Sequence, residues 1–247
     1  MKYNTPVRKA LPILLLCMLS ACSVFRSPAL HGEKQSFRYH EVNGEIEPDE
    51  EMAEFIEPYA APLRDKMDRV LTESKGAFSG DRRGTSGNLA ADILRVRAMH
   101  EMRTMIDVAV LLNGRLGIPL GGGEINLGHI FELLPYDMHI SVLKLNGAQI
   151  LQLASEIAAT GGEPISGMRM RIEDNTARDV LVGHRHVNPE QEYWVATSNW
   201  IADGGGTMPT LWQPLERIDH DLLIRDAMID YLAGKMTIQP ITDYRQR

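Results

Sequence analysis

Apolar residues recur at steps of three and four along residues 52–71, which is the spacing of one face of an α-helix. Pro58 and Pro62 interrupt this stripe. Because a proline inside a helix removes a backbone hydrogen bond, the pattern predicts a bend there or two separate helices. Four further helices are predicted, over residues 87–103, 128–134, 148–160 and 220–234.

Short apolar runs predict the strands. Residues 107–112 and 193–197 are rich in aliphatic side chains, which is typical of buried strands. Residues 141–145 form a similar run, and residues 168–172 alternate between apolar and polar. Because helices and strands interleave with short connections, we expect a single α+β domain over residues 52–247, with a mixed β-sheet flanked by helices.

Residues 1–21 have the pattern of an export signal. Three basic residues precede an apolar run over residues 11–19, which is far shorter than the roughly 20 residues that cross a bilayer. The run ends in Leu19-Ser20-Ala21-Cys22, which resembles the lipobox of bacterial lipoproteins. The resemblance implies cleavage before Cys22 and a lipid anchor on its sulfur. An ordinary signal peptide with a chance cysteine is the alternative.

Residues 22–51 are polar and mixed, so we expect a tether, with a short strand over residues 36–42. Ser23 follows the lipobox cysteine where an Asp would stand, and this resembles the outer-membrane address of Gram-negative lipoproteins. The expected location is therefore the cell envelope, in the outer membrane and facing the periplasm. Because Cys17 leaves with the signal and Cys22 carries the lipid, no disulfide is expected.

Composition and charge narrow the functional class. The 247 residues are 44% hydrophobic and 24% charged, which is ordinary for a globular domain. The formal net charge of −7 argues against a nucleic-acid binder, since such proteins need a broad basic surface.

Two glycine-rich loops each follow a predicted buried strand, over residues 113–123 and 204–206. Loops at strand ends are where α/β sheets bind ligands, and glycine lets backbone amides approach an anion closely. Neither loop has the dinucleotide or Walker pattern. Arg115 lies in the first loop, where its guanidinium is a candidate for binding a phosphate or carboxylate through two parallel hydrogen bonds. The alternative is a solvated surface arginine.

A series of short motifs in a fixed order resembles the C-terminal domain of the 5′-nucleotidase and UDP-sugar hydrolase family. The similarity runs from about residue 54 to residue 232 and implies that domain's α+β fold. The motifs that carry it are Asp107-Val-Ala-Val, Asn113-Gly-Arg115, Leu134-Pro135-Tyr136, Ser166-Gly167 and Asn199-Trp200 with Gly204-Gly205.

In that family the C-terminal domain holds the nucleotide and does not perform the chemistry. By resemblance, Tyr136 and Trp200 stack on opposite faces of the base, and Arg115 binds the phosphate. Base–aromatic stacking contributes about 1–3 kcal/mol and tolerates any base. The resemblance also places Asn113 and Gly205 in the substrate site. The structural alternative for the two aromatic residues is a half-buried ring beside a turn.

This sequence departs from the family pattern at two places. The loop at Asn113-Gly114-Arg115 is about three residues shorter than the family's, so the amide cradle is shortened. Gly206 stands where the family has the acid that holds the sugar hydroxyls, and Asp203 is the candidate to replace it.

The family's catalytic domain, a two-metal phosphoesterase, precedes the C-terminal domain. Only a tether precedes the match here, so we expect no catalytic residue, metal or cofactor in this chain, and divalent metals only in a separate partner phosphatase. Whether the chain takes part in hydrolysis is left open. Two fragments of the metal motifs do occur, at residues 137–139 and 183–186, and a surface histidine pair is the preferred interpretation of the second.

Three hypotheses follow. The first is a lipid-anchored domain that binds a nucleotide or nucleoside and serves nucleotide catabolism together with a separate metallophosphatase. The second is a non-enzymatic envelope module that has kept the fold and lost the ligand. The third is a metal hydrolase that uses Asp137, His139, His184 and His186.

Overall fold

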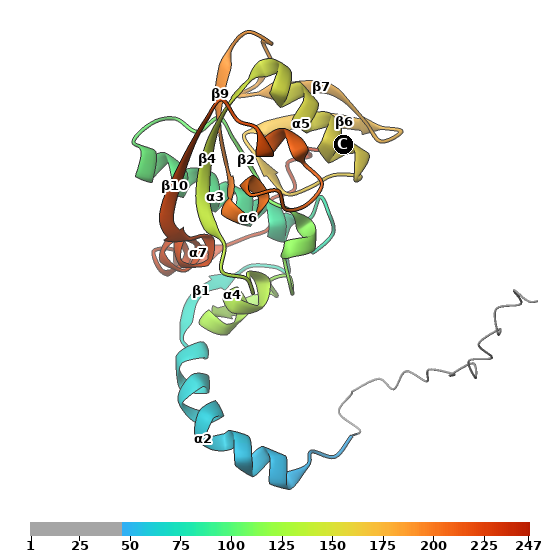
Figure 1. The fold of residues 1–247 in the computed structure, drawn as a ribbon. Helices are drawn as coiled ribbons and strands as arrows, with labels where there is room; N and C mark the ends of the chain where they lie inside the picture. The colour runs from blue at the N-terminus through green and yellow to red at the C-terminus, as the bar shows by residue number, and fades with distance from the viewer. Residues whose placement is uncertain (1–45) are drawn as a thin grey trace, which may run out of the picture. The chain divides into compact units, whose positions relative to one another are not determined.

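The computed structural model describes residues 46–247, and its ribbon is shown in Figure 1. The predicted signal, the lipidation site Cys22 and the strand expected over residues 36–42 lie outside the described residues. The chain divides between residues 50 and 51 into two units. The second unit contains the domain described below.

A five-stranded mixed sheet forms the centre of this unit, with the strand order β10-β4-β9-β2-β5. β2 and β9 run parallel to each other, and the other neighbouring strands are antiparallel. The mixed sheet with its flanking helices confirms the predicted α+β class. The strand bounds are Val108–Val110 for β2, His139–Asn146 for β4, Ile165–Ser166 for β5, Glu192–Ser198 for β9 and Glu216–Leu223 for β10.

Alternate residues of the central strands enter two separate hydrophobic cores. On β4, Ile140 and Val142 pack into the first core, whereas Leu143 and Leu145 pack into the second. This alternation is the two-residue period of a strand that is buried on both faces. The first core contains helices α3 and α7, and the second contains α5 (Figure 1).

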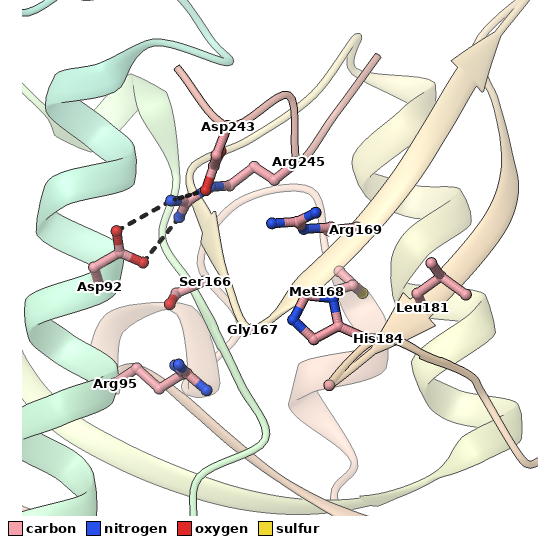
Figure 2. Close-up of a pocket in the computed structure, with 11 residues that line it drawn as sticks. Asp92, Arg95, Ser166, Gly167, Met168, Arg169, Leu181, His184, Asp243 and Arg245 are labelled. Carbon is pink, nitrogen blue, oxygen red and sulfur yellow. Dashed lines mark hydrogen bonds and ion pairs between the residues drawn. The ribbon is translucent and has the colours of Figure 1, made fainter. Parts of the chain in front are cut away.

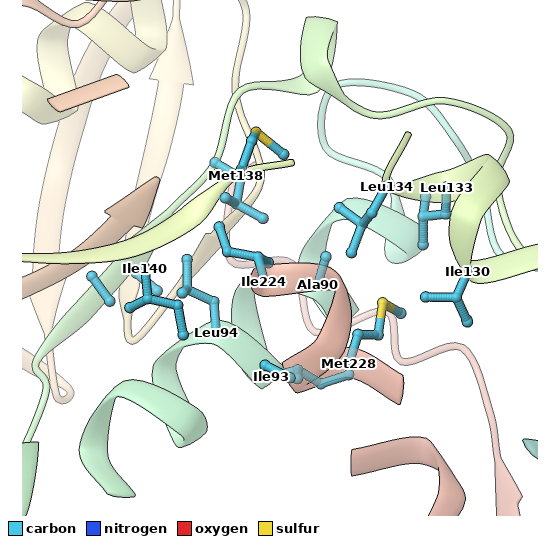
Figure 3. Packing of buried hydrophobic residues seen from close by; sticks show 14 of the residues in the cluster. Ala90, Ile93, Leu94, Ile130, Leu133, Leu134, Met138, Ile140, Ile224 and Met228 are labelled. Carbon is cyan, nitrogen blue, oxygen red and sulfur yellow. The ribbon is translucent and has the colours of Figure 1, made fainter. Parts of the chain in front are cut away.

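The first core shows how the helices cover one face of the sheet. Figure 3 shows Ile93 and Leu94 of α3 close to Ile224 and Met228 of α7, with Ile140 of β4 beside them. All five side chains are at most 2% exposed. The bounds of the helices are Thr85–Met102 for α3, Leu127–Leu133 for α4, Gly147–Ala159 for α5 and Ile224–Ala233 for α7.

Two of the predicted helices begin with reciprocal caps. The Asn126 side chain accepts a hydrogen bond from the backbone N–H of His129, and the His129 side chain accepts one from the backbone of Asn126. Asn146 and Gln149 do the same at the start of α5. Each pair satisfies two backbone donors that no turn of the helix can satisfy, which stabilises the first turn.

Two small sheets were not predicted. One has the order β11-β1-β3 and the other β6-β7-β8, of which only β6 was expected. The register of β6 and β7 is that of a hairpin, in which Glu173 pairs with Thr176. The bounds are Val70–Ser74 for β1, Gly123–Asn126 for β3, Met168–Glu173 for β6, Thr176–Val182 for β7, Arg185–His186 for β8 and Thr237–Ile238 for β11.

Two boundaries of the predicted helices are wrong. Residues 220–223 were predicted to begin the last helix, but they end β10, whose Leu223 pairs with His139 of β4. Residues 70 and 71 were assigned to the first helical stripe, but they begin β1, which pairs with β3 and β11. In both cases pairing with a distant strand overrides a short local pattern.

The first helix, α2, is continuous from Glu50 to Met67 and contains both prolines, so the interruption does not divide it. None of its residues is buried. Its apolar stripe is therefore exposed in the described part of the chain. Within residues 46–247, no helix combines the length and the apolar character that crossing a membrane requires.

Candidate functional site

Three chain segments meet at one edge of the central sheet. Because β2 and β9 are parallel, the residues that follow both strands leave the sheet at the same edge. β4 runs antiparallel to β9, and its Ile140 pairs with Ser198, so the residues that precede β4 reach this edge too. The three segments are the turn η1 (Asn113–Arg115), helix α6 (Asn199–Ala202) and the loop over residues 134–138.

This convergence brings together three of the residues predicted to hold the ligand, namely Arg115, Tyr136 and Trp200. The guanidinium carbon of Arg115 lies 3.9 Å from the ring centroid of Tyr136 and 4.2 Å from that of Trp200. Both distances are within the range of a cation–π interaction. Tyr136 is 44% exposed, whereas Trp200 is half-buried and packs against the second hydrophobic core.

The charge of Arg115 has no carboxylate partner. Among residues 46–247, its side chain forms no ion pair and no hydrogen bond, and its Nε atom is buried without a partner. A buried donor that lacks a partner costs about 1–3 kcal/mol. The guanidinium therefore gains free energy from any anion that reaches it while it is held beside the rings.

A buried carboxylate holds the turn that carries Arg115. Glu163 is fully buried and accepts hydrogen bonds from the backbone N–H of Asn113 at 2.7 Å, from Arg82 at 2.7 Å and from the Thr160 hydroxyl at 3.1 Å. Burial raises the pKa of the Glu163 carboxyl, while the bond from Asn113 and the charge of Arg82 oppose the rise. The backbone N–H of Asn113 therefore anchors the turn that carries Arg115 to the buried Glu163 carboxylate.

A buried arginine holds the loop that carries Tyr136. Arg225 of α7 donates a hydrogen bond to the carbonyl of Leu134 at 3.1 Å and forms an ion pair with Asp137. Its guanidinium also lies 4.2 Å from the ring centroid of Phe131. These contacts fix the backbone on both sides of Tyr136.

The Arg115 turn and the end of α4 are joined directly. The backbone N–H of Gly117 donates to the carbonyl of Leu133 at 2.9 Å, and that of Ile118 donates to Glu132 at 3.0 Å. A Cβ atom at position 117 would lie 2.1 Å from the Glu132 carbonyl oxygen. Only glycine allows this close approach, which places Arg115 within reach of Tyr136.

Trp200 is fixed from several directions. Ser198 caps α6 by accepting a hydrogen bond from Ile201, and the Asn199 side chain accepts one from the backbone N–H of His139. The second glycine loop packs against the Trp200 ring, because a Cβ atom at Gly205 would lie 2.4 Å from two ring atoms. Gly205, predicted to contact substrate, is thus seen here as the support of the ring.

Asp203 is turned toward β10. Its carboxylate pairs with Arg217 at 2.8 Å, and Arg217 also pairs with Asp219 at 2.9 Å. These residues and Asn199 line an open pocket of about 440 Å³. Asp203, the predicted substitute for the family's acid, therefore belongs to an ion-pair network with Arg217. It is not part of the stack that Arg115 forms with the rings of Tyr136 and Trp200.

The four residues of the metal-hydrolase hypothesis are not gathered. Asp137 pairs with Arg225, and His139 of β4 lies 3.5 Å from Asp221. His186 lies on β8, and His184 lies in the turn that joins β7 to β8. Within the part of the chain that the structure describes, no three His, Cys, Asp or Glu side chains are grouped to hold a metal. The motif fragments are therefore not joined by the fold.

Sequence reasoning did not find Glu163 and Arg225. Glu163 bonds to a residue 50 positions away, and Arg225 bonds to one 88 positions away. No local pattern marks a charged residue that will be buried against so distant a partner. The only sequence signal was local context. Glu163 lies in a Gly-Gly-Glu-Pro turn, and Arg225 lies among apolar residues at the start of a helix.

The protein is an α+β domain with a mixed sheet. Two aromatic residues and an arginine meet at the edge of that sheet where the parallel strands β2 and β9 end. The sequence matches the family described as 5′-nucleotidase, C-terminal domain, over residues 70–213, and the chain belongs to that family. The match confirms the resemblance predicted from the motifs.

Individual relatives agree with this assignment. The chain is 23% identical over 205 residues to a 5′-nucleotidase of Vibrio parahaemolyticus, a match that covers 80% of this chain and 36% of that protein. It is 23% identical over 175 residues to protein UshA of Escherichia coli, covering 68% and 31%. The chain thus spans about a third of the length of these curated relatives.

Solved structures show the same fold. The crystal structure of a 5′-nucleotidase precursor from Thermus thermophilus superimposes with a TM-score of 0.73 at 23% identity, covering 81% of this chain and 43% of that one. A sulfate thiohydrolase, SoxB, from the same genus superimposes with a TM-score of 0.59 at 20% identity, covering 80% and 38%. At these identities the likeness shows the fold alone.

Proposed function

We propose that this domain binds a nucleotide or nucleoside, with the base between Tyr136 and Trp200 and a phosphate on Arg115. The observation that carries the proposal is the stack itself, since a planar guanidinium lies over both rings. A nucleobase is also planar and stacks on aromatic faces, so rings that accept one flat group suit the other.

Binding then requires Arg115 to move. Its guanidinium lies over the ring faces that the base would use, so an entering base displaces it. The displaced guanidinium retains its charge and its planar array of donors, which match a phosphate. Cation–π contacts of about 0.5–2 kcal/mol each oppose the displacement, and base stacking and the phosphate contact offset them.

The remaining parts of the proposal concern the cell. We propose that lipidation at Cys22 anchors the chain in the outer membrane facing the periplasm, and that hydrolysis is performed by a metallophosphatase on a separate chain. The lipobox-like Leu19-Ser20-Ala21-Cys22 supports the first part. The second is supported by the match to the C-terminal domain of 5′-nucleotidases and by relatives of that name in two Vibrio species.

The test is calorimetric titration of the purified chain with AMP, UMP, adenosine and UDP-glucose. Saturable binding that Tyr136→Ala and Trp200→Ala each weaken supports the proposed site. Binding that neither substitution alters places the ligand elsewhere and overturns it.

One observation favours the second candidate, an envelope module that has lost the ligand. The Arg115 guanidinium already covers the faces of both rings, which is what a side chain that permanently fills the site would do. In that case none of the four compounds binds to the wild-type chain.

A further inference from the structure

A separate pocket lies between α3, the start of β6 and the turn that joins β7 to β8. It has a volume of about 210 Å³ and is closed on one side by the C-terminal segment. Figure 2 shows Arg95 of α3 and Arg169 of β6 reaching into it from different walls, with His184 beside Arg169. It shares no lining residue with the stack of Arg115, Tyr136 and Trp200.

The pocket contains an excess of positive charge in a chain whose net charge is −7. Its two acids, Asp92 and Asp243, are both bound by Arg245, at 2.9 and 2.6 Å. Arg245 also donates to the carbonyl of Ile165 at 2.6 Å, so this arginine is fully engaged. Both acids of the pocket are therefore ion-paired with one of its three arginines, and Asp243 also lies within the electrostatic influence of Arg169.

The other two arginines have unused donors. Among residues 46–247, neither Arg95 nor Arg169 forms an ion pair. Arg95 makes one long hydrogen bond, 3.4 Å to the carbonyl of Ile106, and its Nε atom is buried without a partner. Asp107 is an acid close to Arg95, but its carboxylate accepts the backbone N–H of Trp194 at 2.8 Å.

A buried hydroxyl completes the set of donors. Ser166 lines the pocket and is 1% exposed, and its hydroxyl takes part in none of the side-chain hydrogen bonds found among residues 46–247. The next residue, Gly167, has a φ of +76°, and a Cβ atom there would lie 2.0 Å from the carbonyl oxygen of Asp107 and 3.1 Å from a terminal nitrogen of Arg95. The backbone is thus kept close to Arg95 at a position that only glycine can occupy.

We propose that this pocket binds a phosphate group, held by Arg95, Arg169 and the Ser166 hydroxyl, with His184 at its rim. Guanidinium groups and a hydroxyl are donors that match the acceptor oxygens of phosphate, and buried donors without partners gain most from such a ligand. The ligand is inorganic phosphate or the phosphate of a phosphomonoester, since both present the same group.

The test uses the purified full chain and inorganic phosphate at low ionic strength, measured by calorimetry and by phosphorus NMR. Wild type is expected to bind one phosphate, with sulfate as a competitor. Arg169→Gln is expected to weaken binding about tenfold or more, because it removes a charge-assisted contact from an exposed side chain whose loss leaves the fold intact. Arg95→Gln and Ser166→Ala are expected to weaken it as well, with folding checked by circular dichroism.

Arg178→Gln is the matched control, because Arg178 is an exposed arginine on β7 of the same small sheet that does not line the pocket. It should leave phosphate affinity unchanged within about twofold, as expected for a surface charge that is screened by salt. Equal weakening by Arg178→Gln and Arg169→Gln would mean general charge attraction and would overturn the site. Absence of saturable phosphate binding would overturn it too.

A double variant, Tyr136→Ala with Trp200→Ala, separates this site from the proposed nucleotide site. It should lose adenosine binding and keep phosphate binding, whereas loss of both would place the phosphate at Arg115 and refute the second site. Titration of the same variant with AMP distinguishes the two sources of phosphate. Binding of AMP shows that the pocket accepts a phosphomonoester, and binding of inorganic phosphate alone shows that it accepts the free ion.

Discussion

At the scale of single residues, the position of Arg115 changes what its removal should do. Its guanidinium lies over Tyr136 and Trp200, so it competes with an entering base as well as serving an entering phosphate. A residue with both roles affects nucleosides and nucleotides in opposite directions.

We expect Arg115→Ala to leave adenosine affinity unchanged or to increase it, because no guanidinium has to leave the rings. The preference for AMP over adenosine should fall by about 1.5–3 kcal/mol, the contribution of a charged hydrogen bond. Titration calorimetry with both ligands measures this preference, and Arg178→Ala is the control. Equal losses for AMP and adenosine would show that Arg115 serves the fold.

The two aromatic residues should differ in their effect on stability. Trp200 packs against the second core and the Gly205 backbone, whereas Tyr136 is 44% exposed. Trp200→Ala should therefore lower Tm more than Tyr136→Ala does, while each costs about 1–3 kcal/mol of nucleoside binding. Thermal unfolding and calorimetry measure the two effects, and a Trp200→Ala variant with a lower Tm and full affinity would remove Trp200 from the site.

Glu163 gives a prediction about pH. Burial raises the pKa of this carboxyl, so the folded state holds the proton more tightly than the unfolded state does. Its favourable effect on stability is therefore present below the unfolded pKa of about 4.3 and is lost as pH rises through the folded pKa. Gln, which has no such titration, still offers an oxygen to the backbone N–H of Asn113.

We compare the free energy of unfolding of wild type minus that of Glu163→Gln. This difference should be smaller at about pH 7 than at about pH 4, because wild type loses stability as the buried carboxyl loses its proton. Denaturant unfolding at both pH values measures it. A difference that grows with pH would mean that the ion pair with Arg82 outweighs the burial of the carboxylate.

At the scale of elements, α2 and α3 show that helices of equal length can differ completely in burial. Both are 18 residues long, but α2 has no buried residue whereas α3 buries eight. The apolar stripe of α2 predicts a helix with one buried face, but none of its residues is buried. A stripe indicates which side chains share a face, and it does not indicate whether anything covers that face.

Substitutions in the two helices should separate accordingly. Phe55→Ser in α2 removes a ring that is 69% exposed and should change the free energy of unfolding by no more than about 0.5 kcal/mol. Ile93→Ala in α3 removes a side chain that is 2% exposed and should cost about 2–5 kcal/mol. Chemical denaturation of both variants tests this, and a large loss from Phe55→Ser would mean that α2 has a covered face.

At the scale of the whole molecule, the proposed anchor is the point to test. Cys22→Ala should release the protein from the membrane fraction, because it removes the site of acylation while leaving residues 51–247 unchanged. Cys17→Ala is the control and should leave the protein with the membranes. Fractionation followed by immunoblotting measures both, and a Cys22→Ala protein that still sediments with membranes and resists a high-salt wash would contradict the lipid anchor.

Much of the central architecture follows from the sequence alone. Local periods mark α3, α5 and the strands β2 and β9, because an element that buries a face must repeat apolar residues at its own spacing. The order of the motifs was enough to indicate the family. The same motifs predicted that Arg115, Tyr136 and Trp200 hold the ligand, and the structure places these three side chains together.

Only the tertiary structure decided how these residues meet. The stack of Arg115 on two rings depends on the parallel pairing of β2 with β9, and its supports, Glu163 and Arg225, act across 50 and 88 residues of chain. The strands β1, β7 and β10 were missed or misassigned for the same reason. The hydrophobic periodicity of a segment indicates which of its faces is buried, but it does not indicate which other segment covers that face. The residues of a site are brought together by pairing between segments that are distant in the sequence.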